Sequence, residues 1–165
     1  MLLRLDNSVR ALYTLYPENQ PVLTRVSAIQ LAKLSGFSPI IVTASVKHTD
    51  FLKSLGATHV LDRNLSPANL KSEVEKITNK PVKYVYDAVS LEETQKQGDA
   101  VLASGGHLML VLSPSISTSD KHFTAVLALR VLEHNVKPLS ALYDKLTGWL
   151  ESGVIKVLFL CFPRP

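Results

Sequence analysis

The chain has 165 residues, of which 46% are hydrophobic and 19% are charged. This length suits one domain with a real core, and the composition is that of a folded globular protein and excludes a disordered one. The formal net charge of +4 arises from 18 Lys and Arg against 14 Asp and Glu, spread along the chain without a basic run. Because nucleic-acid binders concentrate positive charge and interleave aromatic side chains, we expect no nucleic-acid partner.

Cysteine and histidine usage argues against a metal site. Cys161 is the single cysteine, so no disulfide can form within the chain, and the five histidines show no zinc-ligand spacing. No apolar run has the length of a signal peptide or of a membrane span, so we expect a cytoplasmic protein that does not bind membranes. The apolar run at 157–162 needs a covering partner or sheet, and it predicts self-association through this tail or through a sheet edge.

From residue 26 onward, helical and strand patterns alternate. Residues 26–35 predict a buried helix that closes at Gly36, and the β-branched run 39–43 predicts a buried strand. A short helix at 48–55 and a second strand at 58–61 follow. The first part of the chain therefore reads as repeated helix and strand units.

The next helix carries the clearest local signals. Ser66 is a helix N-cap, and Pro67 occupies the first helical position. Leu70, Val74 and Ile77 then follow at a spacing that places them on one helical face. These signals predict a helix that begins at Pro67 and carries Leu70, Val74 and Ile77 on its apolar face.

A third strand is predicted at 82–86, and a fourth at 107–112 after the turn at Gly105-Gly106. Between them, Ser90 and Glu93 form a capping-box pattern that predicts a helix to about residue 102. Two further helices are predicted from apolar spacing. Their marker residues are Phe123, Val126, Leu127 and Val131 for one helix, and Leu139, Leu142, Leu146 and Trp149, ending at Gly153, for the other.

Strands separated by helices predict a three-layer α/β domain with a doubly wound parallel sheet. The pattern leaves two versions open, Rossmann-like and flavodoxin-like. In both, ligands bind beyond the carboxyl ends of the strands, so the residues at these ends are the candidates for function.

Four runs in the sequence together resemble the cofactor domain of medium-chain dehydrogenases/reductases. They are Ala-Ile-Gln-Leu-Ala-Lys-Leu-Ser-Gly at 28–36, Lys-Ser-Leu-Gly-Ala at 53–57, Tyr-Asp at 86–87 and Gly-Gly at 105–106. The resemblance spans roughly residues 26–156. It implies a Rossmann-like NAD(P)-binding fold and an alcohol dehydrogenase-like oxidoreductase.

Within that family, the Ser45-x-Lys47 pattern and the absence of zinc ligands resemble the zinc-independent quinone and enoyl reductases that use NADPH. The resemblance therefore implies NADP(H) as the cofactor, and an enoyl or quinone substrate in a full-length protein. A catalytically silent nucleotide-binding or protein-interaction module is the alternative function.

The sequence departs from the family pattern at both ends. The family's nucleotide domain begins with a strand and a glycine-rich turn, whereas the run from Pro21 to Val26 contains no glycine. We therefore expect a sheet that is incomplete at its first strand, and a cofactor domain without its catalytic domain. The expected segments are an atypical N-terminal segment at 1–25, the NAD(P)-binding domain at 26–156 and an atypical tail at 157–165.

The resemblance assigns cofactor contacts to the strand ends. Ser45, Lys47 and His48 follow the first readable strand, where the family recognises the adenosine ribose, and a hydroxyl with a cation there suits a 2′-phosphate. The alternative is that Ser45 caps the short helix and Lys47 is a solvated surface residue. Arg63 follows the next strand, where contact with the phosphate or the adenine and simple solvation are equal alternatives. We assign no residue to catalysis and none to a metal.

On the other half of the sheet, Ala88 and Val89 are expected to line the nicotinamide ribose, and Leu112 holds the equivalent place after the fourth strand. Asp87 is interpreted as a structural residue that caps a loop.

Overall fold

In the computed structural model of the chain, the described residues are 11–14, 23–127, 129 and 131–156. They fall into two compact units, which divide after Leu127.

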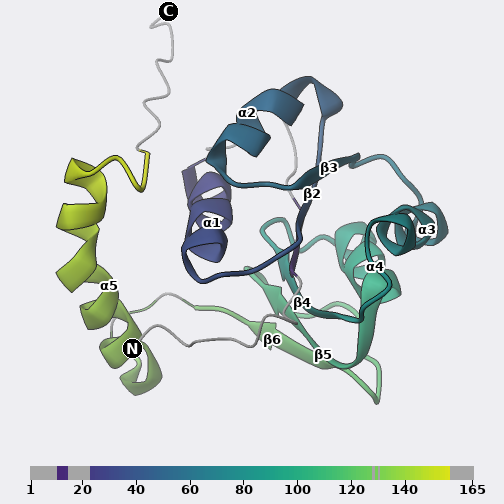
Figure 1. Cartoon of the computed structure of the whole chain (residues 1–165). Helices are drawn as coiled ribbons and strands as arrows, with labels where there is room; N and C mark the ends of the chain where they lie inside the picture. Colours follow the sequence, from purple (N-terminus) through teal and green to yellow (C-terminus); the bar gives the residue numbers. More distant parts are fainter. Residues whose placement is uncertain (1–10, 15–22, 128, 130, 157–165) are drawn as a thin grey trace, which may run out of the picture. The chain divides into compact units, whose positions relative to one another are not determined.

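The first unit is built on a six-stranded sheet, which runs through the centre of Figure 1. All neighbouring strands pair in parallel. The strands are β1 (Ala11–Thr14), β2 (Ile40–Ala44), β3 (His59–Asp62), β4 (Val82–Asp87), β5 (Leu102–Leu110) and β6 (His122–Ala125). Their spatial order is β3-β2-β1-β4-β5-β6. This order is that of the Rossmann fold, so the structure confirms the fold class and selects the Rossmann-like version of it.

Strand β1 corrects the expected gap at the first strand. It lies at the centre of the sheet, where Ala11 pairs with Ile40 of β2 on one side and with Tyr84 of β4 on the other. The sequence Ala-Leu-Tyr-Thr lies within the segment that was expected to be atypical. A strand buried between two neighbours needs no polar alternation, so a run of four residues gives little signal in the sequence.

Helices connect the strands and cover both faces of the sheet (Figure 1). Helices α3 (Pro67–Ile77) and α4 (Glu92–Val101) lie side by side on one face, and α1 (Leu23–Leu34) lies on the other. Helix α2 (Thr49–Leu55) follows a short 3-10 turn, η1 (Val46–His48). The predicted start of α3 is confirmed, because the Ser66 side chain accepts a hydrogen bond from the Asn69 N–H at 3.3 Å.

The core follows the alternation of strand side chains. Ile41 faces α3 and α4, whereas its buried neighbours Ile40 and Val42 face the side that α1 covers with Ile29. Burial of large aliphatic side chains on both faces stabilises the three layers through the hydrophobic effect. The cluster under α3 and α4 consists of Ile41, Leu70, Val74, Val82, Val85, Val101, Leu102, Leu108 and Leu110.

Two predicted element boundaries are wrong. Helix α4 begins at Glu92, with Leu91 as its N-cap and no side-chain cap, so Ser90 does not form a capping box. Ser90 instead has a positive φ of 60° and belongs to the preceding loop. The strand predicted at 107–112 begins earlier and ends earlier, at Leu102–Leu110.

The helix predicted from Phe123 to Val131 is also wrong. Residues His122–Ala125 form strand β6, in which Phe123 pairs with Leu108 of β5. The apolar residues that suggested a helical face continue into an exposed stretch, where Val126 and Leu127 are 44% and 54% exposed. Cross-strand pairing with β5 has therefore overridden the helical spacing.

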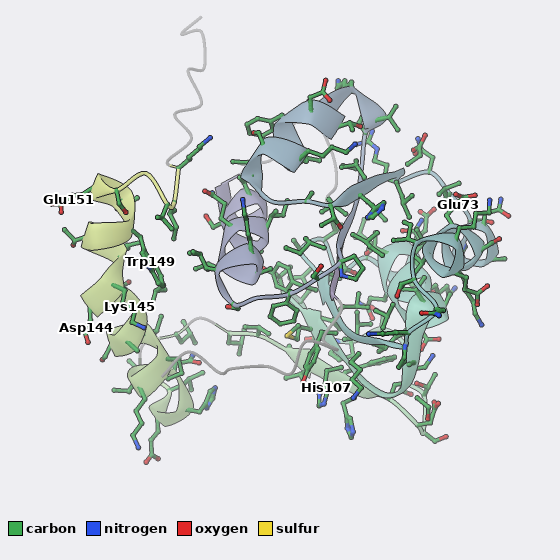
Figure 2. The ribbon with its side chains drawn as sticks, viewed as in Figure 1. Glu73, His107, Asp144, Lys145, Trp149 and Glu151 are labelled. Atoms are coloured by element: carbon green, nitrogen blue, oxygen red, sulfur yellow. The ribbon has the colours of Figure 1, made fainter. Side chains whose placement is uncertain are left out.

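The second unit contains helix α5 (Glu133–Glu151), which confirms the last predicted helix. The predicted apolar residues of α5, among them Trp149 (labelled in Figure 2), are half-buried, whereas most positions between them are exposed. Gly153 follows the helix with a positive φ of 69°.

Candidate dinucleotide site

The parallel sheet brings the carboxyl ends of all six strands to one edge. The connections run to opposite sides of the sheet after β1 and after β4, and the last residues of these two strands, Thr14 and Asp87, are in register. In doubly wound sheets this reversal point is where a dinucleotide lies across the strand ends. The predicted site residues fall on both sides of it.

On one side, the ends of β2 and β3 lie next to each other. The Arg63 N–H donates a hydrogen bond of 3.1 Å to the Ala44 carbonyl. Ser45 directly follows Ala44 and is half-buried, while Lys47 and His48 are exposed on η1. The structure therefore places the Ser45 hydroxyl and the side chains of Lys47 and Arg63 at the ends of neighbouring strands.

The acidic group that marks NAD selectivity is absent at the end of β2, where Ala44 is followed by Ser45. The carboxylate at the end of β3, Asp62, accepts a hydrogen bond of 2.9 Å from the Asn64 N–H in its own turn. The residues at the ends of β2 and β3 therefore suit an anionic ligand group better than the two hydroxyl groups of a ribose.

On the other side, Asp87 organises the loop after β4. Its side chain is buried, and Oδ1 accepts hydrogen bonds of 2.9 Å from the N–H groups of Val89 and Ser90. Oδ2 accepts a hydrogen bond of 2.6 Å from the Thr94 hydroxyl on α4. These bonds confirm the interpretation of Asp87 as a structural residue that caps a loop.

The same loop is joined to the end of β5. The Ser90 hydroxyl donates to the Asp87 carbonyl at 3.0 Å and accepts from the Val111 N–H at 2.8 Å. The half-buried Ala88 and Val89 therefore lie at a strand end next to the one that carries Leu112, whose exposed fraction is 56%.

The middle of the site departs from the usual pattern. Between the end of β1 and the start of α1, the sequence at 15–22 is Leu-Tyr-Pro-Glu-Asn-Gln-Pro-Val, without a glycine. Rossmann folds place a pyrophosphate there, against backbone N–H groups that a glycine turn exposes. The residues present thus suit the two ends of a dinucleotide better than its centre, and segment 15–22 itself lies outside the described residues.

Two residues that the sequence analysis missed are Gln95 and Gln97 of α4, which are 0% and 4% exposed. Polar residues on a helix usually mark its solvent-exposed face, so the residue type did not indicate that these two side chains are buried. A weak signal was present, because Gln97 shares a helical face with Thr94 and Val101 by its spacing.

Metal clusters and membrane-spanning helices are both absent from the part of the chain that the structure describes. It contains no group of three His, Cys, Asp or Glu residues arranged to hold a metal ion. None of its helices combines the length and apolar character needed to span a membrane. Cys161 and the apolar run 157–162 lie outside the described residues.

A family model described as zinc-binding dehydrogenase matches residues 26–134. The chain belongs to the zinc-binding dehydrogenase family. The resemblance seen in the sequence is thereby confirmed.

Curated relatives of this zinc-binding dehydrogenase chain include reductases. The trans-enoyl reductase TOXD of Cochliobolus carbonum is 33% identical over 132 residues, which cover 79% of this chain and 43% of the relative. A zinc-type alcohol dehydrogenase-like protein of Schizosaccharomyces pombe is 28% identical over 145 residues, covering 77% and 41%. The chain thus spans less than half the length of either relative.

Solved structures agree on the fold of this zinc-binding dehydrogenase chain. Escherichia coli quinone oxidoreductase complexed with NADPH matches with a TM-score of 0.70 at 20% identity, over 92% of this chain and 48% of that one. A mycobacterial protein complexed with NADPH also has a TM-score of 0.70 at 20% identity, over 90% and 47%.

Proposed function

We propose that this chain binds NADP(H) as the cofactor domain of an enoyl reductase-like oxidoreductase. The observation that carries the proposal is the cluster of Ser45, Lys47 and Arg63 at the adjoining ends of β2 and β3. It lies on one side of the reversal point in a sheet of Rossmann order. NADPH supplies the hydride in such enzymes, and the protein supplies its position and its electrostatic surroundings.

Recognition of the 2′-phosphate is the task that we assign to this cluster. A phosphate presents several strong acceptor oxygens, which suit the Ser45 hydroxyl and the charged ends of Lys47 and Arg63. His48, exposed on the same turn, can add a ring N–H donor. No carboxylate stands at the end of β2, where one would bind the ribose of NAD and would repel the 2′-phosphate of NADP.

The nicotinamide half is assigned to the other side of the reversal point. Ala88, Val89 and Leu112 present small or apolar side chains at the ends of β4 and β5, where they can pack against the nicotinamide ribose. The identity with a trans-enoyl reductase supports an activated enoyl group as the substrate of the whole protein, with a quinone as the second substrate class.

One observation favours a second candidate, a catalytically silent nucleotide-binding module that associates with another protein chain. Strand β6 lies at one edge of the sheet, and the exposed Val126 and Leu127 directly follow it. Within the described residues β6 is an edge strand, and an edge strand followed by exposed apolar side chains favours self-association. The apolar run 157–162 stays a predicted second surface.

Calorimetric titration of this chain with NADPH and with NADH tests the proposal. We expect NADPH to bind more tightly, because only NADPH carries the phosphate that the Ser45 and Lys47 cluster can meet. Tighter binding of NADH would contradict the assignment of this cluster. Binding of NADPH without turnover in a form of full family length would favour the silent module.

A further inference from the structure

Helix α4 carries two buried glutamines that contact different loops. The Gln97 Nε2 group donates hydrogen bonds to the backbone carbonyls of Arg63 at 3.1 Å and Leu65 at 2.8 Å. These carbonyls belong to the loop that joins β3 to α3. Gln97 therefore holds the loop on the side of the site where Arg63 lies.

Gln95 performs the corresponding task on the other side. Its Nε2 group donates to the Ser90 carbonyl at 3.0 Å and to the Ser113 carbonyl at 3.3 Å. Its Oε1 atom accepts from the Ser115 N–H at 2.8 Å. One amide thus ties the loop after β4 to the loop after β5.

Because both amides are buried, the loops that they hold depend strongly on their hydrogen bonds. A buried amide is costly unless its polar atoms are hydrogen-bonded, and here both Nε2 groups and the Gln95 Oε1 atom are bonded to backbone groups of loops. Ser113 and Ser115 are exposed, so little apolar packing fixes the loop that carries them. The conformation of each loop consequently depends on the glutamine that holds it.

We propose that Gln95 and Gln97 are positioning residues that separately hold the two halves of the cofactor site, Gln97 the adenosine half and Gln95 the nicotinamide half. The inference rests on the proposed function, because it takes the ends of β2 and β3 as the adenosine side. Neither glutamine contacts the cofactor in this proposal; each acts through the backbone that presents the contact residues.

The test compares Gln95→Met and Gln97→Met, which preserve side-chain length and remove the amide. Two ligands are titrated, NADPH and adenosine 2′,5′-bisphosphate, which reproduces the adenosine half alone. We expect Gln97→Met to weaken both ligands by about tenfold, or about 1.4 kcal/mol. Gln95→Met should weaken NADPH by about the same factor and leave the bisphosphate unchanged.

Lys96→Met supplies the matched control, since Lys96 lies between the two glutamines and is exposed. Its Nζ atom donates to Glu92 Oε1 at 2.6 Å, and this hydrogen bond lowers the pKa of the Glu92 carboxyl. Loss of a surface pair at the start of α4 should leave both affinities unchanged. Far-UV circular dichroism establishes that each variant is folded.

Hydrogen exchange on the unsubstituted chain gives a second measurement that needs no variant. NADPH should slow exchange of the Val111 and Ser115 amides, whereas the bisphosphate should not. Equal losses of both ligands in both variants, unchanged affinities in folded variants, or equal protection by both ligands would overturn the inference alone. Failure of the unsubstituted chain to bind NADPH would overturn the proposed function, and this inference with it.

Discussion

Lys47 offers a direct test of the proposed recognition of the 2′-phosphate. It lies on η1 directly beyond β2, and its side chain is exposed. Lys47→Ala should weaken NADPH binding by about 1–3 kcal/mol, because one charge-assisted contact with the phosphate is lost. NADH affinity should stay constant. Calorimetry measures the affinities for NADPH and NADH, with Lys53→Ala on the exposed side of α2 as the control. An unchanged NADPH affinity would mean that Lys47 is a solvated surface residue that does not contact the phosphate.

Thr94 tests the structural role of Asp87. Its hydroxyl donates to the buried Asp87 Oδ2 at 2.6 Å, and valine reproduces its shape without the donor. Thr94→Val should lower the free energy of unfolding by about 1–3 kcal/mol, because a buried carboxyl group loses one of its hydrogen bonds. Urea denaturation gives the value. An unaltered midpoint would mean that Asp87 does not depend on this bond.

The positions of the candidate site residues in the fold were partly predictable from the sequence. Ser45, Arg63 and Val89 could be selected because strand ends in a parallel sheet meet at one edge, and a strand can be recognised from its apolar run. Gln95 and Gln97 could not, since their contacts are with loops distant in the sequence, and only the folded chain shows that their helical face is buried.

Helix α4 packs closely on the sheet at Gly98. A β-carbon at this position would lie 2.9 Å from Leu108 Cδ1 and 3.2 Å from Val85 Cγ1, and both side chains are fully buried. Gly98→Ala should therefore destabilise the fold by about 1 kcal/mol, because overpacking outweighs the gain in helix propensity.

Gly148 of α5 is the matched control, because among the described residues no atom outside its chain neighbours and its own helix backbone lies within 4 Å of a β-carbon there. Gly148→Ala should stabilise α5 by roughly 0.5–1 kcal/mol through helix propensity alone. Thermal and urea unfolding of the two variants give opposite signs if close packing decides the choice of glycine. Stabilisation by both substitutions would show that the sheet yields to the added methyl group.

Elements with local signals were predicted well. Helix α3 has a serine cap, a proline at its first position and an apolar face, and all three depend on neighbouring residues only. Strand β6 has no such signal: Phe123, Val126 and Leu127 fit helical spacing, and the pairing of Phe123 with Leu108 is a long-range contact. The central strand β1 was missed for the same reason.

At the scale of the whole molecule, we predict that this chain alone has no measurable reductase activity. It spans 43% of a trans-enoyl reductase relative, and hydride transfer needs a substrate held at near-attack distance from the nicotinamide. The sequence at 15–22 also contains no glycine, the residue whose turn exposes backbone N–H groups to a pyrophosphate in Rossmann folds.

The measurement is NADPH oxidation by purified, monodisperse protein with enoyl and quinone substrates. A form extended to the length of its relatives serves as the positive control. Comparable turnover by the chain alone would show that it contains a complete catalytic site.

The central place of β1 has a consequence for how the sheet assembles. The backbone of Ala11–Thr14 pairs with β2 on one side and with β4 on the other. These four residues therefore join the half of the sheet formed by β2 and β3 to the half formed by β4, β5 and β6. During synthesis these residues precede the other five strands of the sheet, and their second partner, β4, follows only after two further strands and three helices. Such non-local pairing closes slowly, because the loop entropy is lost before the contacts form. Until β4 has been synthesised, the edge of β1 that will pair with it therefore stays open to other chains around the nascent protein.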